Sequence, residues 1–166
     1  MRSENLNFKN PLTWFAIGFG AGLFPIAQGT IGSLVACLFF YFFIVPFLKP
    51  FAFIFIILIY CLLLISSFFF GLYIYKRTMG EEKDAKTFVW DEFLGIWITC
   101  FPLFFFDFTW IWILLSFVLF RVFDVWKPRP IKYFDKMDNS FGVMMDDVVA
   151  GFISALIIFI AVEVFY

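Results

Sequence analysis

Uncharged apolar runs of membrane-spanning length dominate this chain. The clearest extends from Phe51 to Tyr75 without a charged residue, and a helix needs about 20 apolar residues to cross the hydrocarbon core of a bilayer. With 64% hydrophobic and only 15% charged residues, the composition lies far from that of a soluble domain. The chain is therefore predicted to be an all-α integral membrane protein, with residues 1–166 forming a single membrane-embedded domain.

The uncharged runs predict about five transmembrane helices and one shorter element. Glycine and proline residues interrupt the run 10–48, which predicts a short or re-entrant helix over 12–24 before the first span. The third and fifth spans reach sufficient length only if their first turns include carboxylates. The predicted spans cover residues 30–47, 51–75, 88–106, 109–126 and 146–166.

Basic residues are distributed unevenly between the two sides of this topology. Eleven of the 12 Lys and Arg residues fall on one side, and only Lys49 lies opposite. Because basic residues gather on the cytoplasmic side of a membrane, the N-terminus and the polar clusters are expected to be cytoplasmic. The net charge of −1 provides no basic field for nucleic acid, and no nucleic-acid partner is expected.

Carboxylates and glycines share helix faces where two spans begin. Asp91 and Gly95, and again Asp147 and Gly151, are four residues apart, and a glycine there lets a neighbouring helix approach closely. Charges at span ends are often solvated flanks, or caps and first-turn groups that favour the helix dipole. Several carboxylates and cations at one depth instead indicate a functional site.

The residue types at this depth narrow the chemistry. The chain has no histidine, which excludes histidine-based acid–base catalysis and histidine-rich zinc sites. Arg121, Asp124 and Lys127 repeat at a three-residue spacing, and Pro128 disfavours helix at Lys127. Because Mg²⁺ prefers oxygen ligands and Arg binds phosphate oxygens, these residues predict a magnesium and phosphate site for a membrane phospholipid.

Four motifs follow one another along most of the chain. They are GFGAGLFPIAQGTIGS (18–33), DAKTFVWDEFLGIWIT (84–99), FRVFDVWKPRPIKYFD (120–135) and FGVMMDDVVAGFISA (141–155). In these motifs the sequence resembles the phosphatidylglycerophosphatase A family, although Gln28 stands where that family usually has proline and Asn139-Ser140 replaces a more glycine-rich turn. The resemblance implies a multi-pass phosphatase of the bacterial inner membrane that converts phosphatidylglycerophosphate to phosphatidylglycerol with Mg²⁺.

Residue chemistry and resemblance together predict the roles at this site. Glu92, Asp91 and Asp147 are the predicted catalytic residues, with Glu92 orienting or deprotonating the attacking water. The predicted Mg²⁺ ligands or their close neighbours are Asp84, Asp91, Glu92, Asp124, Asp146 and Asp147. The predicted substrate-binding residues are Arg121, Lys127, Arg129, Thr30 and Ser33.

Three other classes of protein remain open at this point. A membrane protein without phosphatase activity could use the carboxylates as a cation or proton site, although transporters usually place such groups near the bilayer midplane. A phosphatidyl-transferase would carry a D-G…A-R…G…D…D run, which the sequence lacks. A non-catalytic assembly protein would explain the glycines and aromatic residues but not the carboxylates.

Overall fold

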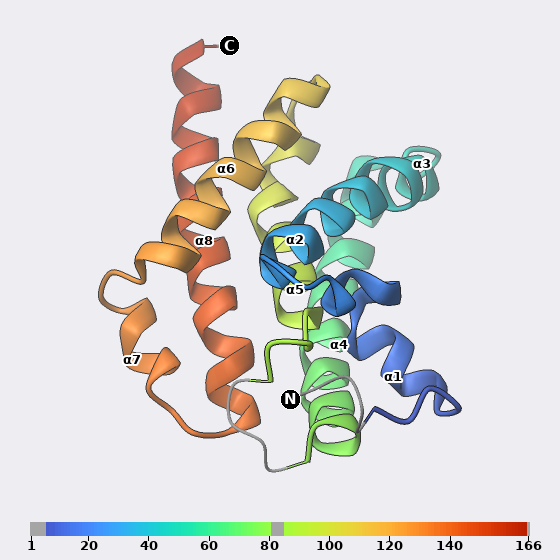
Figure 1. Cartoon of the computed structure of the whole chain (residues 1–166). Helices are drawn as coiled ribbons and strands as arrows, with labels where there is room; N and C mark the ends of the chain where they lie inside the picture. Colours follow the sequence, from blue (N-terminus) through green and yellow to red (C-terminus); the bar gives the residue numbers. More distant parts are fainter. Residues whose placement is uncertain (1–5, 81–84, 166) are drawn as a thin grey trace.

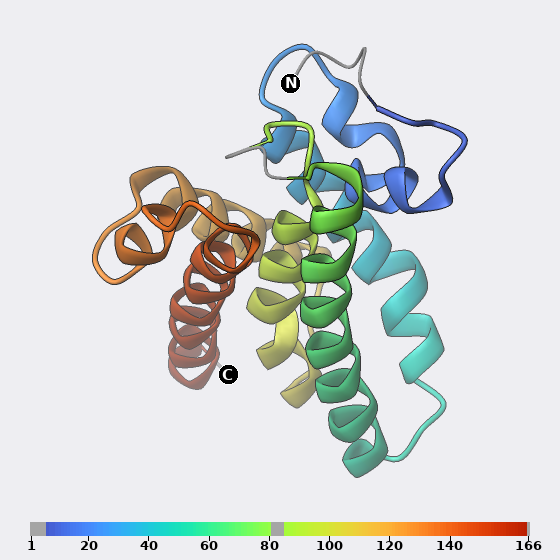
Figure 2. The same cartoon turned by 90° about the horizontal axis from the view of Figure 1, so that it is seen from below.

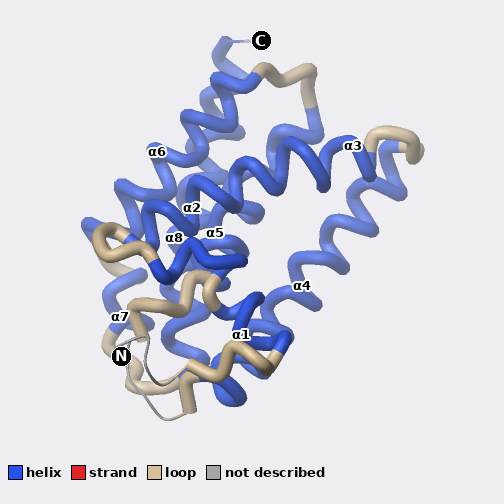
Figure 3. The backbone as a smooth tube through the Cα atoms, turned by 45° about the vertical axis from the view of Figure 1, so that its right-hand side comes forward, coloured by secondary structure: helices blue, strands red, loops and turns tan. Residues whose placement is uncertain are grey.

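The computed structural model describes residues 6–80 and 85–165, and within these ranges the chain is helical with no strand (Figures 1 and 3). This confirms the predicted all-α class. The elements in chain order are α1 (Pro11–Ala16), η2 (Gly18–Leu23), α2 (Gln28–Phe39), η3 (Phe40–Ile44), α3 (Val45–Leu48), α4 (Phe53–Thr78), α5 (Trp90–Cys100), η4 (Phe101–Phe105), α6 (Trp110–Trp126), α7 (Ile131–Asp135) and α8 (Ser140–Phe165).

Three helical segments of the described chain are long and apolar enough to cross a membrane. They are Gln28–Leu48, Phe53–Thr78 and Ser140–Val164. α5 with η4, and α6, occupy the positions of the predicted third and fourth spans, but the 17 residues of α6 rise only about 25 Å at 1.5 Å per residue. Three spanning helices therefore agree with the predicted topology, and the full number of five stays a prediction.

The predicted short element before the first span consists of two helical pieces. η2 follows α1 and has a kink inside it at Phe19 and Gly20, where the φ angles are positive. The Val89 N–H donates to the Ala16 carbonyl at 2.9 Å, so this N-terminal segment contacts the chain just before α5. The segment thereby lies beside α4 and the start of α5 (Figure 2).

Helix α5 forms the centre of the bundle, and α2, α4, α6 and α8 pack around it. Its closest crossing is with α8, where a Cβ on Gly151 would lie only 2.6 Å from the Gly95 carbonyl oxygen. The Phe120 ring of α6 packs against Gly95 from another direction. Both glycines therefore allow the close helix approach that their spacing predicts.

Helix α8 begins earlier than the predicted fifth span. It starts at Ser140, and the Asn139 side-chain oxygen accepts a hydrogen bond from the Gly142 N–H at 2.8 Å. Asn is a favoured residue before a helix because its side chain satisfies a free backbone donor. The predicted start at Asp146 was wrong, and Asp146 and Asp147 lie beyond the first turn, where they cannot cap the helix.

Aromatic donors satisfy backbone carbonyls between the helices. At the end of α5 the Phe101 N–H donates to the Ile98 carbonyl, which leaves the Trp97 carbonyl without its helical partner. The hydroxyl of fully buried Tyr60 in α4 donates to that carbonyl at 2.7 Å. Hydrocarbon offers no alternative donor, so this bond ties α4 to α5.

Tyr60→Phe is expected to destabilise the protein, because it leaves the Trp97 carbonyl unsatisfied. The free energy of unfolding in lipid–detergent micelles should fall by about 1 kcal/mol. Tyr41→Phe is the control, since Tyr41 is exposed. Equal stability of the two variants would contradict the assignment.

Candidate active site

A cavity of about 1230 Å³ opens at one end of the bundle, where α2, α5 and α8 begin and α4 and α6 end. Its wall contains residues from each of these helices and from the connection between α6 and α8. Seven predicted site residues line it: Asp91, Glu92, Arg121, Asp124, Lys127, Asp146 and Asp147.

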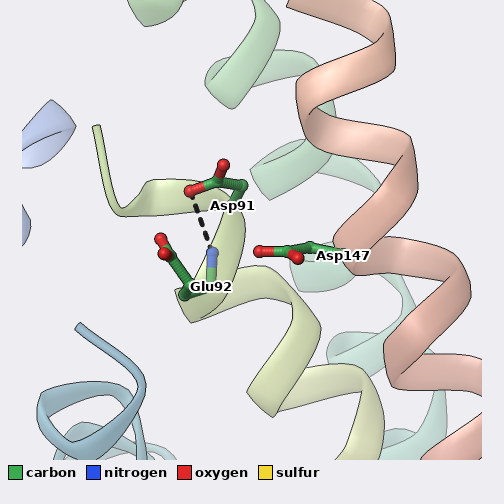
Figure 4. A group of neighbouring side chains, drawn as sticks. All are labelled: Asp91, Glu92 and Asp147. Carbon is green, nitrogen blue, oxygen red and sulfur yellow. Dashed lines mark hydrogen bonds between the residues drawn. The ribbon is translucent and has the colours of Figure 1, made fainter. Parts of the chain in front are cut away.

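Three carboxylates converge in this cavity. Asp91 and Glu92 lie in the first turn of α5, and Asp147 reaches toward them from α8 (Figure 4). One carboxylate oxygen from each residue lies within 4.8 Å of the others. Asp91 and Asp147 are buried, at 9% and 4% exposure, and buried like charges so close together require a compensating cation or protons.

The donor set fits a divalent cation with hard-oxygen preference. Three carboxylates from two rigid helices can each supply one oxygen, and Mg²⁺ is typically held by a few carboxylates and completed by water and phosphate oxygens. Within the described chain, Glu92 Oε2 is buried without a hydrogen-bond partner. The Glu92 N–H donates to Asp91 Oδ1 at 3.1 Å, which orients the Asp91 carboxylate against the first turn of α5.

A guanidinium group lies beside these carboxylates. Arg121 Nη1 donates to Asp124 Oδ2 and lies 3.5 Å from Ser33 Oγ, while its Nε is buried without a partner among the described residues. A Cβ on Gly29 would collide with Glu92 Oε1 and approach Arg121 Nη1 to 3.1 Å. Glycine at this position therefore allows the start of α2 to pack directly on the carboxylate and the guanidinium.

The ammonium group of Lys127 lies between two other carboxylates. Its Nζ donates to Asp146 Oδ2 at 2.7 Å and to Asp135 Oδ1 at 2.5 Å. Burial alone would lower the pKa of Lys127, but these two carboxylates raise it well above its usual value. Lys127 thus stays charged at neutral pH.

The predicted site residues do not all lie in the cavity. Thr30 and Arg129 are absent from its lining, and Arg129 is exposed beyond the end of α6. Ser33 is absent from the lining as well; its hydroxyl donates to the Gly29 carbonyl at 2.7 Å and lies 3.5 Å from Arg121 Nη1. Asp84 lies outside the described residues, so its predicted ligand role stays a prediction.

Asp135 and Gln28 are among the polar residues of the cavity wall that sequence reasoning missed. Asp135 pairs with Lys127 from α7, and the only sequence signal was its place at the end of the third motif. Gln28, which departs from the usual family residue, donates through Nε2 to the Gly22 carbonyl at 3.0 Å. This bond closes the loop between η2 and α2 at the cavity edge.

The fold and the cavity define a helical membrane protein with a candidate metal and phosphate site at one end of the bundle. The model of the phosphatidylglycerophosphatase A family matches residues 14–162. The match covers most of the chain and includes all the carboxylates and cations that line the cavity. The chain therefore belongs to the phosphatidylglycerophosphatase A family.

Curated relatives agree with this assignment. The chain is 42% identical over 159 residues to phosphatidylglycerophosphatase A of Escherichia coli K12, covering 94% of this chain and 86% of the relative. It is 37% identical to the protein of that name from Haemophilus influenzae, over 94% and 91% of the two chains. A putative phosphatidylinositol-3-phosphatase of Bacteroides thetaiotaomicron is 33% identical over 87% and 89%. No solved structure matches.

Proposed function

We propose that this chain hydrolyses the terminal phosphomonoester of phosphatidylglycerophosphate, releasing phosphatidylglycerol and inorganic phosphate. The supporting observation is its membership of the phosphatidylglycerophosphatase A family over residues 14–162. The protein is accordingly a phosphoric monoester hydrolase of phospholipid synthesis. The apolar helices and the bacterial relatives support a lipid substrate taken from a bacterial membrane.

Asp91, Glu92 and Asp147 are the residues that would hold Mg²⁺. Their oxygens lie within 4.8 Å of one another. Asp124 lines the same cavity and pairs with Arg121, which suits a further ligand or a close neighbour of one. When bound, the ion would supply positive charge against the phosphoryl oxygens. We propose Asp84 as a further ligand, or a neighbour of one, from the sequence alone.

The chain's own residues provide the remaining chemistry. Glu92 has a buried oxygen without a hydrogen-bond partner in the described structure, so it can orient a water molecule and accept its proton during attack on phosphorus. Arg121 Nε has no partner among the described residues, and a guanidinium can bind phosphoryl oxygens in a planar, bidentate arrangement. Lys127 adds a second positive charge on the α6 side of the cavity.

The cavity would face the cytoplasm of a multi-pass inner-membrane protein. The bias of basic residues toward that side supports this orientation, and a site at the ends of the spans suits a phosphate at headgroup level. On this arrangement the acyl chains stay in the bilayer, and only the headgroup enters the polar cavity. The five predicted spans complete this topology.

Phosphate release by the purified protein tests the function. Phosphatidylglycerophosphate should be hydrolysed with Mg²⁺ and not with a chelator, and Glu92→Gln should lose about 100-fold or more in rate. Phosphatidic acid, which has a single phosphate, serves as the comparison substrate. A folded wild-type protein that releases no phosphate from phosphatidylglycerophosphate would contradict the proposal, and undiminished release with chelator would contradict the Mg²⁺ part.

Arg121→Lys tests whether this residue contacts the phosphoryl group or only pairs with Asp124. Lysine keeps the charge and can still pair with a carboxylate, but it lacks the planar fork. We expect kcat/KM to fall at least about tenfold, with the unfolding temperature nearly unchanged. Normal turnover in Arg121→Lys would mean that Arg121 only pairs with Asp124 and does not contact the phosphoryl group.

A further inference from the structure

The adjacent Asp146 and Asp147 face different partners in the cavity. Asp147 belongs to the group with Asp91 and Glu92, whereas Asp146 accepts a hydrogen bond from Lys127. We propose that the two adjacent aspartates have different roles. Asp147 belongs to the metal-binding group, whereas Asp146, together with Asp135, is a positioning residue that holds Lys127 at the phosphoryl group. This inference rests on the proposed phosphatase function.

Helix geometry allows such a division of roles. Successive residues of an α-helix point about 100° apart, so Asp146 and Asp147 leave α8 in different directions. Asp147 faces α5, and Asp146 is directed to the end of α6. The second oxygen of Asp146, Oδ1, accepts from the Asp147 backbone N–H at 3.0 Å. Both oxygens of Asp146 thus accept hydrogen bonds, and Asp146 is not part of the group in which Asp91, Glu92 and Asp147 each offer one oxygen.

The backbone conformation of Lys127 is a second observation, independent of its side-chain hydrogen bonds, that the protein holds this residue in one position. Lys127 has a φ of 47° and lies in the left-handed region, which non-glycine residues rarely adopt. Its N–H still donates to the Phe123 carbonyl at 2.8 Å, so the residue closes α6 and turns the chain. Unusual backbone conformations persist where the surroundings over-determine them, often at functional sites.

Asp135 binds the same Lys127 ammonium from α7. The short helix α7 packs on α8, and its Asp135 reaches Lys127 Nζ while Asp146 binds it from α8. A lysine side chain is long and flexible, and two acceptors restrict it to one position. An ammonium has three N–H donors, so one remains for a phosphoryl oxygen in the cavity that Lys127 lines.

Metal binding and the positioning of Lys127 predict different phenotypes for the corresponding variants. Neutralising a positioning residue should loosen Lys127 and weaken substrate binding without changing the Mg²⁺ requirement. Neutralising Asp147 should weaken Mg²⁺ binding, because affinity at oxygen-ligand sites depends on carboxylate charge. Asp135 is more exposed than Asp146, at 39% against 10% of the side chain, so its variant should have the smaller effect.

The experiment measures KM for phosphatidylglycerophosphate and the Mg²⁺ concentration at half-maximal rate. KM should rise about threefold in Asp135→Asn and about tenfold in Asp146→Asn, with an unchanged Mg²⁺ requirement. In Asp147→Asn the Mg²⁺ requirement should rise about tenfold or more. Asp135→Glu should restore KM, and Lys132→Gln, an exposed change on α7, should alter neither quantity.

Two further readouts separate positioning from a general structural effect. In a Lys127→Gln background, Asp135→Asn and Asp146→Asn should add little to the rise in KM, because their shared partner is already absent. Without substrate, Mg²⁺ should raise the unfolding temperature of wild type, Asp135→Asn and Asp146→Asn, but not of Asp147→Asn. If Asp147→Asn does not fold, Asp91→Asn takes its place.

The inference is overturned if Asp146→Asn loses the Mg²⁺-induced stabilisation as Asp147→Asn does, or if the KM effects add fully to that of Lys127→Gln. The stabilisation by Mg²⁺ does not depend on the substrate. A wild-type protein that binds Mg²⁺ but leaves phosphatidylglycerophosphate intact would therefore refute the proposed function alone, while the variants still report on the division between Asp146 and Asp147.

Discussion

The close crossing of α5 and α8 at Gly95 and Gly151 is the constraint on which the site depends. With no side chain on either glycine, the helices approach until a Cβ on Gly151 would meet the Gly95 carbonyl oxygen. One helical turn toward the cavity, the same approach brings the carboxylates of Asp91 and Asp147 together with that of Glu92. Packing in the bundle thus forces like charges into a buried space, and their repulsion must be offset by a bound cation or by protons.

Ion pairs connect the charged residues around this crossing. Arg121 pairs with Asp124, and Lys127 is shared by Asp135 and Asp146. Cations therefore flank the carboxylate group on the α6 side, and among the described residues they pair with Asp124, Asp135 and Asp146. A phosphate bound between them would meet the metal group on one side and guanidinium and ammonium groups on the other, which is the arrangement that phosphoryl transfer requires.

Much of the helix order and of the site composition could be predicted from sequence. The four-residue spacing of aspartate and glycine predicted that a neighbouring helix would approach α5 and α8 closely, and Pro128 predicted that α6 would end before Lys127. The start of α8 could not be predicted from hydropathy, because it depends on a side-chain bond from Asn139. The partners of Asp146 and Asp147 depend on how α8 is rotated, and Asp135 reaches Lys127 only because α7 folds back onto α8.

Direct metal binding tests the central claim that Asp91, Glu92 and Asp147 form one divalent-cation site. The measurement is an electron paramagnetic resonance titration of the purified, lipid-free protein with Mn²⁺, which prefers the same oxygen ligands as Mg²⁺. The wild type and the control Glu163→Gln, altered at an exposed residue near the far end of α8, should bind Mn²⁺ in a saturable way. A variant with Asp91→Asn, Glu92→Gln and Asp147→Asn combined should not, and wild-type affinity in that folded variant would contradict the account.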